Sequence, residues 1–133
     1  MKSKTLISLL FAAAALYDGL LGLIFLFATR TVFQWFDVPE PNHLGYAQFP
    51  AALLIVFAIM FVAIALAPAA NRNLIIYGIL LKVSYCGVVF KYWFTSGIPD
   101  MWKPFAIFDL VFMVLFIISY LVLRPKALQT GNL

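Results

Sequence analysis

Four long apolar runs fill most of this 133-residue chain, and three of them contain charged residues well inside. The runs are Leu6–Ala28, Tyr46–Ala67, Leu74–Ser96 and Pro104–Leu123. Each reaches the ~20 residues that a helix needs to cross ~30 Å of hydrocarbon. The sequence therefore predicts one integral membrane domain over residues 1–133, an all-α bundle of four transmembrane helices.

Composition excludes a soluble fold. Hydrophobic residues make up 65% of the chain and charged residues 11%, whereas a soluble domain has roughly 25% charged residues. So few polar side chains cannot cover the surface of a soluble protein of this size. The lipid bilayer is therefore the expected surrounding of the helices.

The cations are distributed unevenly between the two sides of the expected bundle. In a four-span chain the N-terminus, the second loop and the C-terminus lie on one side. That side carries five cations and no acidic residue, namely Lys2, Lys4, Arg72, Arg124 and Lys126. The positive-inside rule then predicts that the N and C termini are cytoplasmic. Basic ends suit anionic lipid headgroups, but the cations are too few and too scattered for a nucleic-acid partner.

The start of the chain imitates a secretory signal, because Lys2 and Lys4 precede an apolar run with small residues at Ala12–Ala15. The run continues to Ala28, which is too long for the apolar region of a signal peptide. We therefore expect an uncleaved first transmembrane span. The single cysteine, Cys86, lies within the third run, so no intramolecular disulfide is expected.

Asp18, Lys82 and Asp109 are the most suggestive residues, because an ionised side chain near the bilayer centre costs at least ~2.5–3.5 kcal/mol on insertion scales. Such residues should face the bundle interior and find partners. One arrangement pairs Asp18 with Lys82 and Asp109 with Lys91. However, Lys82 and Lys91 are nine residues apart, which is about half a turn out of phase on a helix. In the other arrangement Lys91 reaches the headgroups, and Lys82 and Asp109 both bond to Asp18 with one carboxyl group protonated. Tyr85 could share this buried polar network.

Small residues surround Asp18 on the first run. Ala14, Ala15 and Gly22 share its helical face, and Gly19 follows it. Small residues let helix backbones approach closely in lipid, so we expect the first span to pack tightly against a partner, with Asp18 as an interhelical acceptor. The buried charges then form either a clasp that fixes helix register or a functional site for protons, ions or a polar headgroup. Contact with another subunit is the third interpretation, and a homodimer is conceivable.

The connections carry aromatic residues and prolines. The longest, Thr31–Gly45, contains Trp35 and Phe36, and aromatic residues concentrate at membrane interfaces. This favours an interfacial anchor with a short surface helix, and a lid over a site is the alternative. Trp102 marks the interface again before the fourth span. Pro50 fits the first turn of the second span, where a missing N–H costs nothing. The short second loop predicts that spans two and three are antiparallel neighbours.

The sequence lacks the residue patterns that most catalytic sites require. His43 is the single histidine and lies in a loop, which excludes a haem held by two histidines within the bundle, and metal-ligand clusters are absent. The sequence has no phosphate-binding glycine loop and no hydrolytic triad, and Cys86 is expected to be an apolar filler. We therefore expect no enzyme activity, no metal and no resident cofactor.

Aromatic residues follow helical spacing in the fourth run. They are Phe105, Phe108, Phe112 and Phe116. This stripe predicts helix packing or lipid contact. The sharper alternative is a groove for an apolar ligand such as a quinone, a pigment or a lipid, and the stripe could also dock onto a larger membrane protein.

Short motifs spread over most of the chain carry a family resemblance. They are Tyr17-Asp18-Gly19, Val38-Pro39-Glu40-Pro41, Asn71-Arg72, Lys82 and Phe108-Asp109. This set resembles the small four-helix membrane proteins grouped as DoxX-like. The resemblance implies a four-helix bundle, and some members of that family look like accessory subunits of quinone-linked oxidoreductases. The expected location is the bacterial inner membrane, as a multi-pass protein.

Small multidrug exporters offer a second comparison, because they are also four-span chains with one acidic residue in the first span. This chain differs from them in its long first loop, in the additional Lys82 and Asp109, and in having Asp18 where they have glutamate. The comparison keeps open a small proton-coupled transporter that uses Asp18.

The sequence favours a non-catalytic integral membrane protein, an accessory or assembly subunit beside a larger membrane complex. Its buried charges would set the packing, and its aromatic surface would meet lipid, cofactor or partner. The transporter that uses Asp18 and a binder of a lipophilic ligand, such as a quinone or pigment, are the alternatives.

Overall fold

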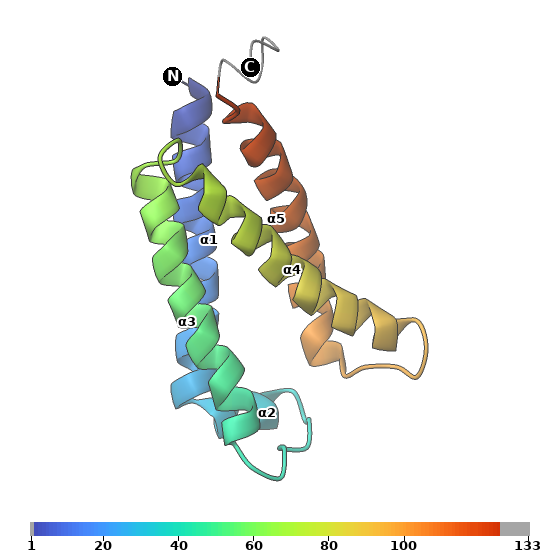
Figure 1. Ribbon diagram of the computed structural model, residues 1–133. Helices are drawn as coiled ribbons and strands as arrows, with labels where there is room; N and C mark the ends of the chain where they lie inside the picture. Colours follow the sequence, from blue (N-terminus) through green and yellow to red (C-terminus); the bar gives the residue numbers. More distant parts are fainter. Residues whose placement is uncertain (1, 126–133) are drawn as a thin grey trace.

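The computed structural model describes residues 2–125, and this part of the chain is built from helices and their connections (Figure 1). The four long helices are α1 (Lys2–Phe27), α3 (Gly45–Leu66), α4 (Arg72–Trp93) and α5 (Lys103–Val122). The short helix α2 (Thr29–Trp35) follows α1, and a single 3-10 turn, η1 (Asp100–Trp102), leads into α5.

Each long helix is long and apolar enough to cross a membrane. The predicted fold class, an all-α bundle with four membrane-spanning helices, is therefore confirmed. The start of α1, the α3–α4 connection and the end of α5 lie at the same end of the bundle (Figure 1). Lys2, Lys4, Arg72 and Arg124 consequently gather at one end, as a four-span chain requires. The C-terminal stretch with Lys126 lies outside the described residues. The cytoplasmic orientation of this end stays a prediction.

Two local features differ from the sequence-based expectation. The third span ends at Trp93 rather than at Ser96, with Phe94 as its C-cap. Gly97 then turns the chain with a φ of +91° and donates its N–H back to the carbonyl of Tyr92 at 2.6 Å. Pro50 lies inside α3, five residues after its start, and not in the first turn. It therefore cannot donate the helical hydrogen bond to the carbonyl of Tyr46.

The buried faces of the helices contain small and polar residues among large apolar ones. On α4 the buried positions recur every three or four residues: Ile75, Gly78, Lys82, Cys86 and Val89. The outward faces are also apolar, and large side chains there are widely exposed. In lipid there is no hydrophobic driving force that favours burying leucine between helices. The orientation of each helix therefore depends on which face offers small residues or needs hydrogen-bond partners.

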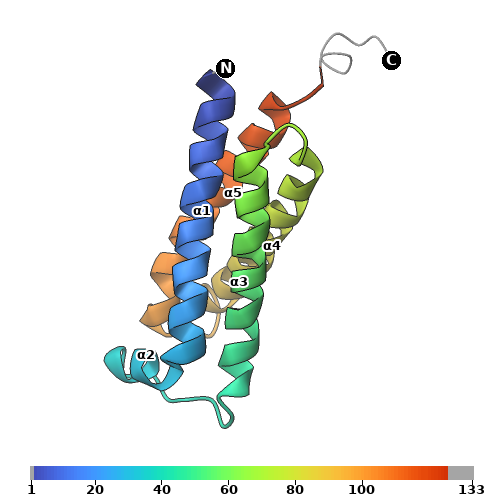
Figure 2. The same ribbon diagram turned by 90° about the vertical axis from the view of Figure 1, so that its left-hand side faces the viewer.

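The helices associate as two pairs, α1 with α3 and α4 with α5. Figure 2 shows α1 and α3 side by side over most of their length. Spans two and three, now α3 and α4, run antiparallel as expected, but they diverge from their short connection (Figure 1) and contact each other over a small part of their length. The partner of α3 is instead α1, where a methyl group on Gly22 would lie 2.7 Å from the carbonyl oxygen of Ala51.

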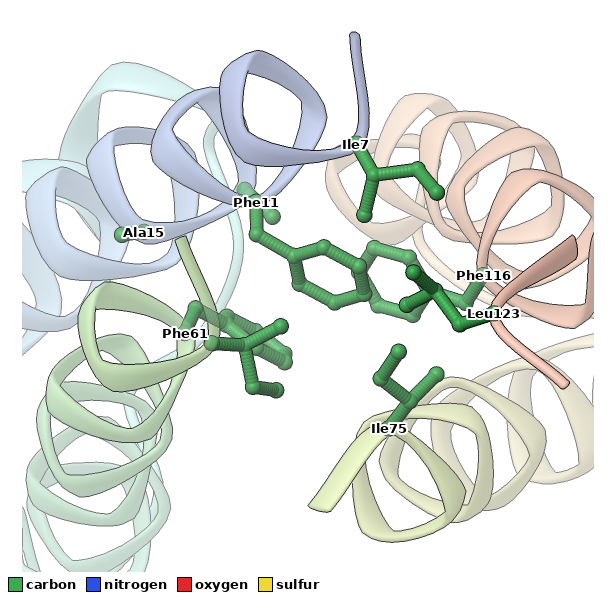
Figure 3. Packing of buried hydrophobic residues seen from close by; sticks show 9 residues of the cluster. Ile7, Phe11, Ala15, Phe61, Ile75, Phe116 and Leu123 are labelled. Atoms are coloured by element: carbon green, nitrogen blue, oxygen red, sulfur yellow. The ribbon is translucent and has the colours of Figure 1, made fainter. Parts of the chain in front are cut away.

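Two apolar clusters join the pairs at opposite ends of the bundle. The Phe11 cluster lies at the end with the termini and consists of Ile7, Phe11, Ala14, Ala15, Phe61, Ile64, Ile75, Phe116 and Leu123. Figure 3 shows its rings meeting between the helices, with Phe11 stacked on Phe116 at 4.5 Å between ring centres. The Phe25 cluster lies at the other end and consists of Phe25, Val32, Phe33, Ala51 and Met101. The clusters close both ends of the interior and leave its middle for polar residues.

Gly22 and Gly87 provide a matched test of the α1–α3 contact. We expect Gly22→Ala to destabilise the protein by about 1–3 kcal/mol, the usual cost of overpacking, because the new methyl group would press on Ala51 and on Ile55, 2.8 Å away. Gly87 has no heavy atom within 4 Å of such a methyl group, so Gly87→Ala should be neutral or stabilise by up to ~1 kcal/mol. Thermal unfolding of the purified protein in detergent measures both. Equal shifts in the two variants would contradict this packing.

Candidate functional site

A lysine and two aspartates meet in the middle of the bundle. The ammonium group of Lys82 donates to both carboxylate oxygens of Asp18, at 3.0 and 2.9 Å, and to Oδ1 of Asp109 at 2.9 Å. Lys82 is 0% exposed, Asp18 1% and Asp109 7%. We call these three side chains the Asp–Lys–Asp network. An ammonium group has three N–H donors, and three carboxylate oxygens surround this one.

The helices leave room for Lys82 because small residues flank it. Gly78 lies one turn before Lys82, and a methyl group there would come within 2.8 Å of the Phe61 ring. Without that methyl group the ring packs directly over α4. Three aromatic rings then surround the ammonium group, with centres 5.4 Å (Phe112), 5.6 Å (Tyr17) and 5.9 Å (Phe61) from Nζ. Aromatic faces within about 6 Å attract a cation. The three rings therefore compensate for part of the hydration that the ammonium group loses on burial.

The network joins the two helix pairs. Asp109 and Lys82 belong to the α4–α5 pair, whereas Asp18 belongs to the α1–α3 pair. The two hydrogen bonds to Asp18 therefore cross between the pairs. The bond to Asp109 holds the lysine within its own pair. The arrangement can fix the relative position of the pairs in the centre of the bundle, between the Phe11 and Phe25 clusters.

Burial makes this network costly to form and costly to break. Removing two ions from water costs several kcal/mol per ion, and their attraction offsets that cost only with good geometry and further hydrogen bonds. Loss of one partner leaves the other charge buried and unpaired. If both carboxyl groups are ionised, the network carries a net charge of −1, because it has two carboxylates and one ammonium group. The network therefore offers one more acidic group than it has cations.

The structure brings together three of the four residues expected in a buried polar network. Asp18 bonds to Lys82, as the sequence suggested. The pair of Asp109 with Lys91 was wrong, because Asp109 bonds to Lys82 instead. Lys91 is exposed, with its ammonium group 5.4 Å from the Tyr92 ring. The centre of the network is thus the lysine and not Asp18, the residue expected to receive both other groups.

Tyr85 does not bond to the network. Its hydroxyl donates to the backbone carbonyl of Trp102 at 2.9 Å. This bond fastens α4 to η1, at the start of α5. Tyr85 lies three residues beyond Lys82 on α4, but its side chain reaches toward the end of the bundle with the Phe25 cluster.

Tyr17 is the residue that sequence reasoning missed. Its hydroxyl oxygen is buried and has no hydrogen-bond partner within the described part of the chain. Its ring packs on Phe108 and Phe112 of α5, at 6.0 and 5.4 Å between ring centres. The sequence feature that could have identified Tyr17 is its position directly before Asp18. Consecutive residues on a helix point about 100° apart, so the two side chains face different neighbouring helices. Tyr17 therefore adds a ring 5.6 Å from the Lys82 ammonium group and a buried hydroxyl that is not bonded to the network.

The predicted interfacial aromatic residues lie apart from the network. Trp35 and Phe36 are 73% and 51% exposed, at the end of α2. Trp102 instead packs against Phe25 and Phe33, with ring centres 5.7 and 6.2 Å away. A short helix does follow the first span, as expected, and Val32 and Phe33 hold it in the Phe25 cluster. Trp102 therefore contributes to the interior, whereas Trp35 and Phe36 face outward.

The phenylalanine stripe of α5 divides between core and surface. Phe116 is fully buried, Phe112 is partly buried and Phe108 is 53% exposed. Within residues 2–125, no group of three histidine, cysteine, aspartate or glutamate side chains could hold a metal ion. One surface hollow of about 510 Å³ is lined by His43, Gly45, Tyr46, Phe49 and Pro50. A second, of about 320 Å³, lies between α1 and α5, and neither is lined by the network.

Comparisons with family models, with curated proteins and with solved structures found no match to this chain. The function must therefore be argued from the Asp–Lys–Asp network and from the outer surface of the helices.

A double-mutant cycle tests the network. We expect Lys82→Met to destabilise the protein by about 3–5 kcal/mol, because it leaves two buried carboxyl groups without their cation. Asp18→Asn should cost less, since Lys82 keeps Asp109. Once Lys82 is replaced, adding Asp18→Asn should cost little or should restore stability. Equilibrium unfolding in detergent measures all three variants.

The exposed Lys91 supplies the matched control. Lys91→Met should change the unfolding free energy by no more than about 0.5 kcal/mol, as is usual at a surface position. Strictly additive effects of Lys82→Met and Asp18→Asn would show that the two side chains do not interact.

Proposed function

We propose that this protein is a non-catalytic integral membrane subunit that supports the assembly of a larger membrane-protein complex. The observation that carries the proposal is the closed Asp–Lys–Asp network, in which Lys82 is fully buried and bonded to both carboxylates. The charged groups best placed for chemistry in the bilayer are engaged with one another. Their role in this proposal is to fix the packing of the two helix pairs.

The outer surface supplies the contact area for a partner. At the end of α4, the rings of Phe90, Trp93 and Phe94 stack with centres 5.7 to 5.9 Å apart and planes within 18° of parallel. Phe94 is 75% exposed, and the Lys103 ammonium group lies 5.2 Å from the Trp93 ring. Aromatic residues are enriched where protein interfaces form and at membrane interfaces. We propose this aromatic end of α4 as part of the contact with the partner.

The proposal extends the family resemblance. A DoxX-like subunit in the bacterial inner membrane, with cytoplasmic termini, would suit the basic end that holds Lys2, Lys4, Arg72 and Arg124. In that setting the partner would be a membrane complex of the quinone-linked redox type.

A second candidate is a small proton-coupled transporter. The observation that favours it is the excess of acidic groups, because Asp18 and Asp109 share one cation. The unpartnered hydroxyl of Tyr17 adds a further polar group beside them. Intramembrane carboxyl groups commonly mark proton pathways. In this candidate, release of Asp18 from Lys82 would accompany transport.

Purification in two detergents tests the subunit proposal. We expect the tagged full-length chain to bring down a larger membrane protein in fixed ratio in mild detergent and to lose it in harsh detergent. Lys82→Met should weaken this association because it disturbs the packing of the helix pairs, whereas Lys91→Met should retain it. Mass spectrometry of the co-purified proteins is the measurement.

The transporter candidate predicts a different pattern. In that case no other protein would co-purify with the chain in mild detergent. Vesicles reconstituted with the chain alone would show proton-coupled flux, and Asp18→Asn would abolish it. That pair of results would overturn the subunit proposal.

A further inference from the structure

We propose that the hollow between the start of α1 and the end of α5 binds one acyl chain of an anionic phospholipid, whose headgroup lies against the lysines of α1. The hollow measures about 320 Å³ and is lined by Ser3, Leu6, Ile7, Leu10, Leu115, Ile118, Ser119 and Val122. This inference is independent of the proposed partner complex, because it concerns a different face and a different ligand.

The lining suits an acyl chain. Six of its eight residues are leucine, isoleucine or valine, and the hydroxyl of Ser119 donates to the carbonyl of Leu115 at 2.8 Å. This bond engages the Ser119 hydroxyl within α5. Ile7 is buried beneath the hollow in the Phe11 cluster, whereas Leu6 is 66% exposed at its edge. The floor is therefore packed protein and the open side faces the surroundings of the helices.

Charge placement identifies the headgroup. Lys2, Leu6 and Leu10 follow one another at intervals of four residues and so form one stripe along α1. Lys2 thus continues the lining of the hollow to the end of the helix. Lys4, two residues further on, points about 200° away from Lys2 around α1, and both lysines are exposed. Arg124 follows α5 at the same end. A lipid headgroup with a net negative charge would meet cations here.

The acidic residues lie elsewhere. The chain has five acidic residues, of which Asp18 and Asp109 are buried with Lys82. At the opposite end Glu40 is 3.0 Å from Arg30 and Asp100 is 2.6 Å from Lys103. Asp37 and Lys91 bring that end to three acidic residues and three cations, so its formal net charge is zero. The excess positive charge is confined to the end where the hollow opens. This complementarity favours an anionic phospholipid over a zwitterionic one and over an apolar helix, because each surface lysine attracts anionic lipid by about 1 kcal/mol.

Lipid binding to the full chain tests the proposal. Native mass spectrometry would compare phosphatidylglycerol with phosphatidylcholine carrying the same acyl chains. We expect tighter binding of phosphatidylglycerol. Lys2→Gln with Lys4→Gln should weaken that binding by about fivefold for each lysine and leave phosphatidylcholine unchanged. Lys91→Gln, at the opposite end of the bundle, is the charge control and should have no effect.

Filling the hollow tests the acyl-chain site separately. Ile118→Trp should weaken the binding of both lipids, whereas Val111→Trp, at an equally exposed position of α5 outside the lining, should not. Equal binding of the two lipids by the unmodified chain, or equal effects of Ile118→Trp and Val111→Trp, would overturn the site. A photoreactive side chain at Ile118 that captured a polypeptide or a second copy of the chain in membranes, in place of phospholipid, would overturn it as well.

Discussion

The structure depends on one buried ammonium group. Lys82 is removed from water in the middle of α4, and its three hydrogen bonds reach Asp109 on its own helix pair and Asp18 on the other. In hydrocarbon an unpartnered charge is among the most expensive features that a helix can carry. The relative position of the two pairs is therefore constrained, because both carboxylates must reach the same nitrogen.

This constraint compensates for what lipid cannot provide. Leucine on the outside of a membrane helix is as well solvated as leucine inside, so apolar burial distinguishes poorly between alternative packings. Small residues then decide how close helices come, as Gly22 does for α1 and α3. Polar residues decide which faces meet. The apolar clusters around Phe11 and Phe25 close the ends of an interior whose centre is polar.

Much of this architecture could be predicted from the sequence, but the pairing could not. The length of the apolar runs indicates four spans, and the small residues around Asp18 indicate a close helix contact. Counting residues along upright helices places Lys82 and Asp109 at different depths and Lys91 close to Asp109. Figure 1 shows α4 strongly inclined relative to α3, and that tilt changes the depths. Tilt depends on packing against neighbours, so counting residues from the ends of a span does not reveal it. Tyr17 was missed for a related reason, since its direction toward α5 depends on where α5 lies.

The order of the network residues along the chain has a consequence for biogenesis. Chains are synthesised from the N-terminus, so Asp18 enters the bilayer while Lys82 and Asp109 are still to be made. The pair of α1 and α3 can form at that stage, while the carboxyl group of Asp18 still has no cation to bind. The interior of the bundle is complete only after α4 and α5 have been inserted as well. A nascent chain stopped after α3 would therefore carry Asp18 without the ammonium group that binds it in the completed protein.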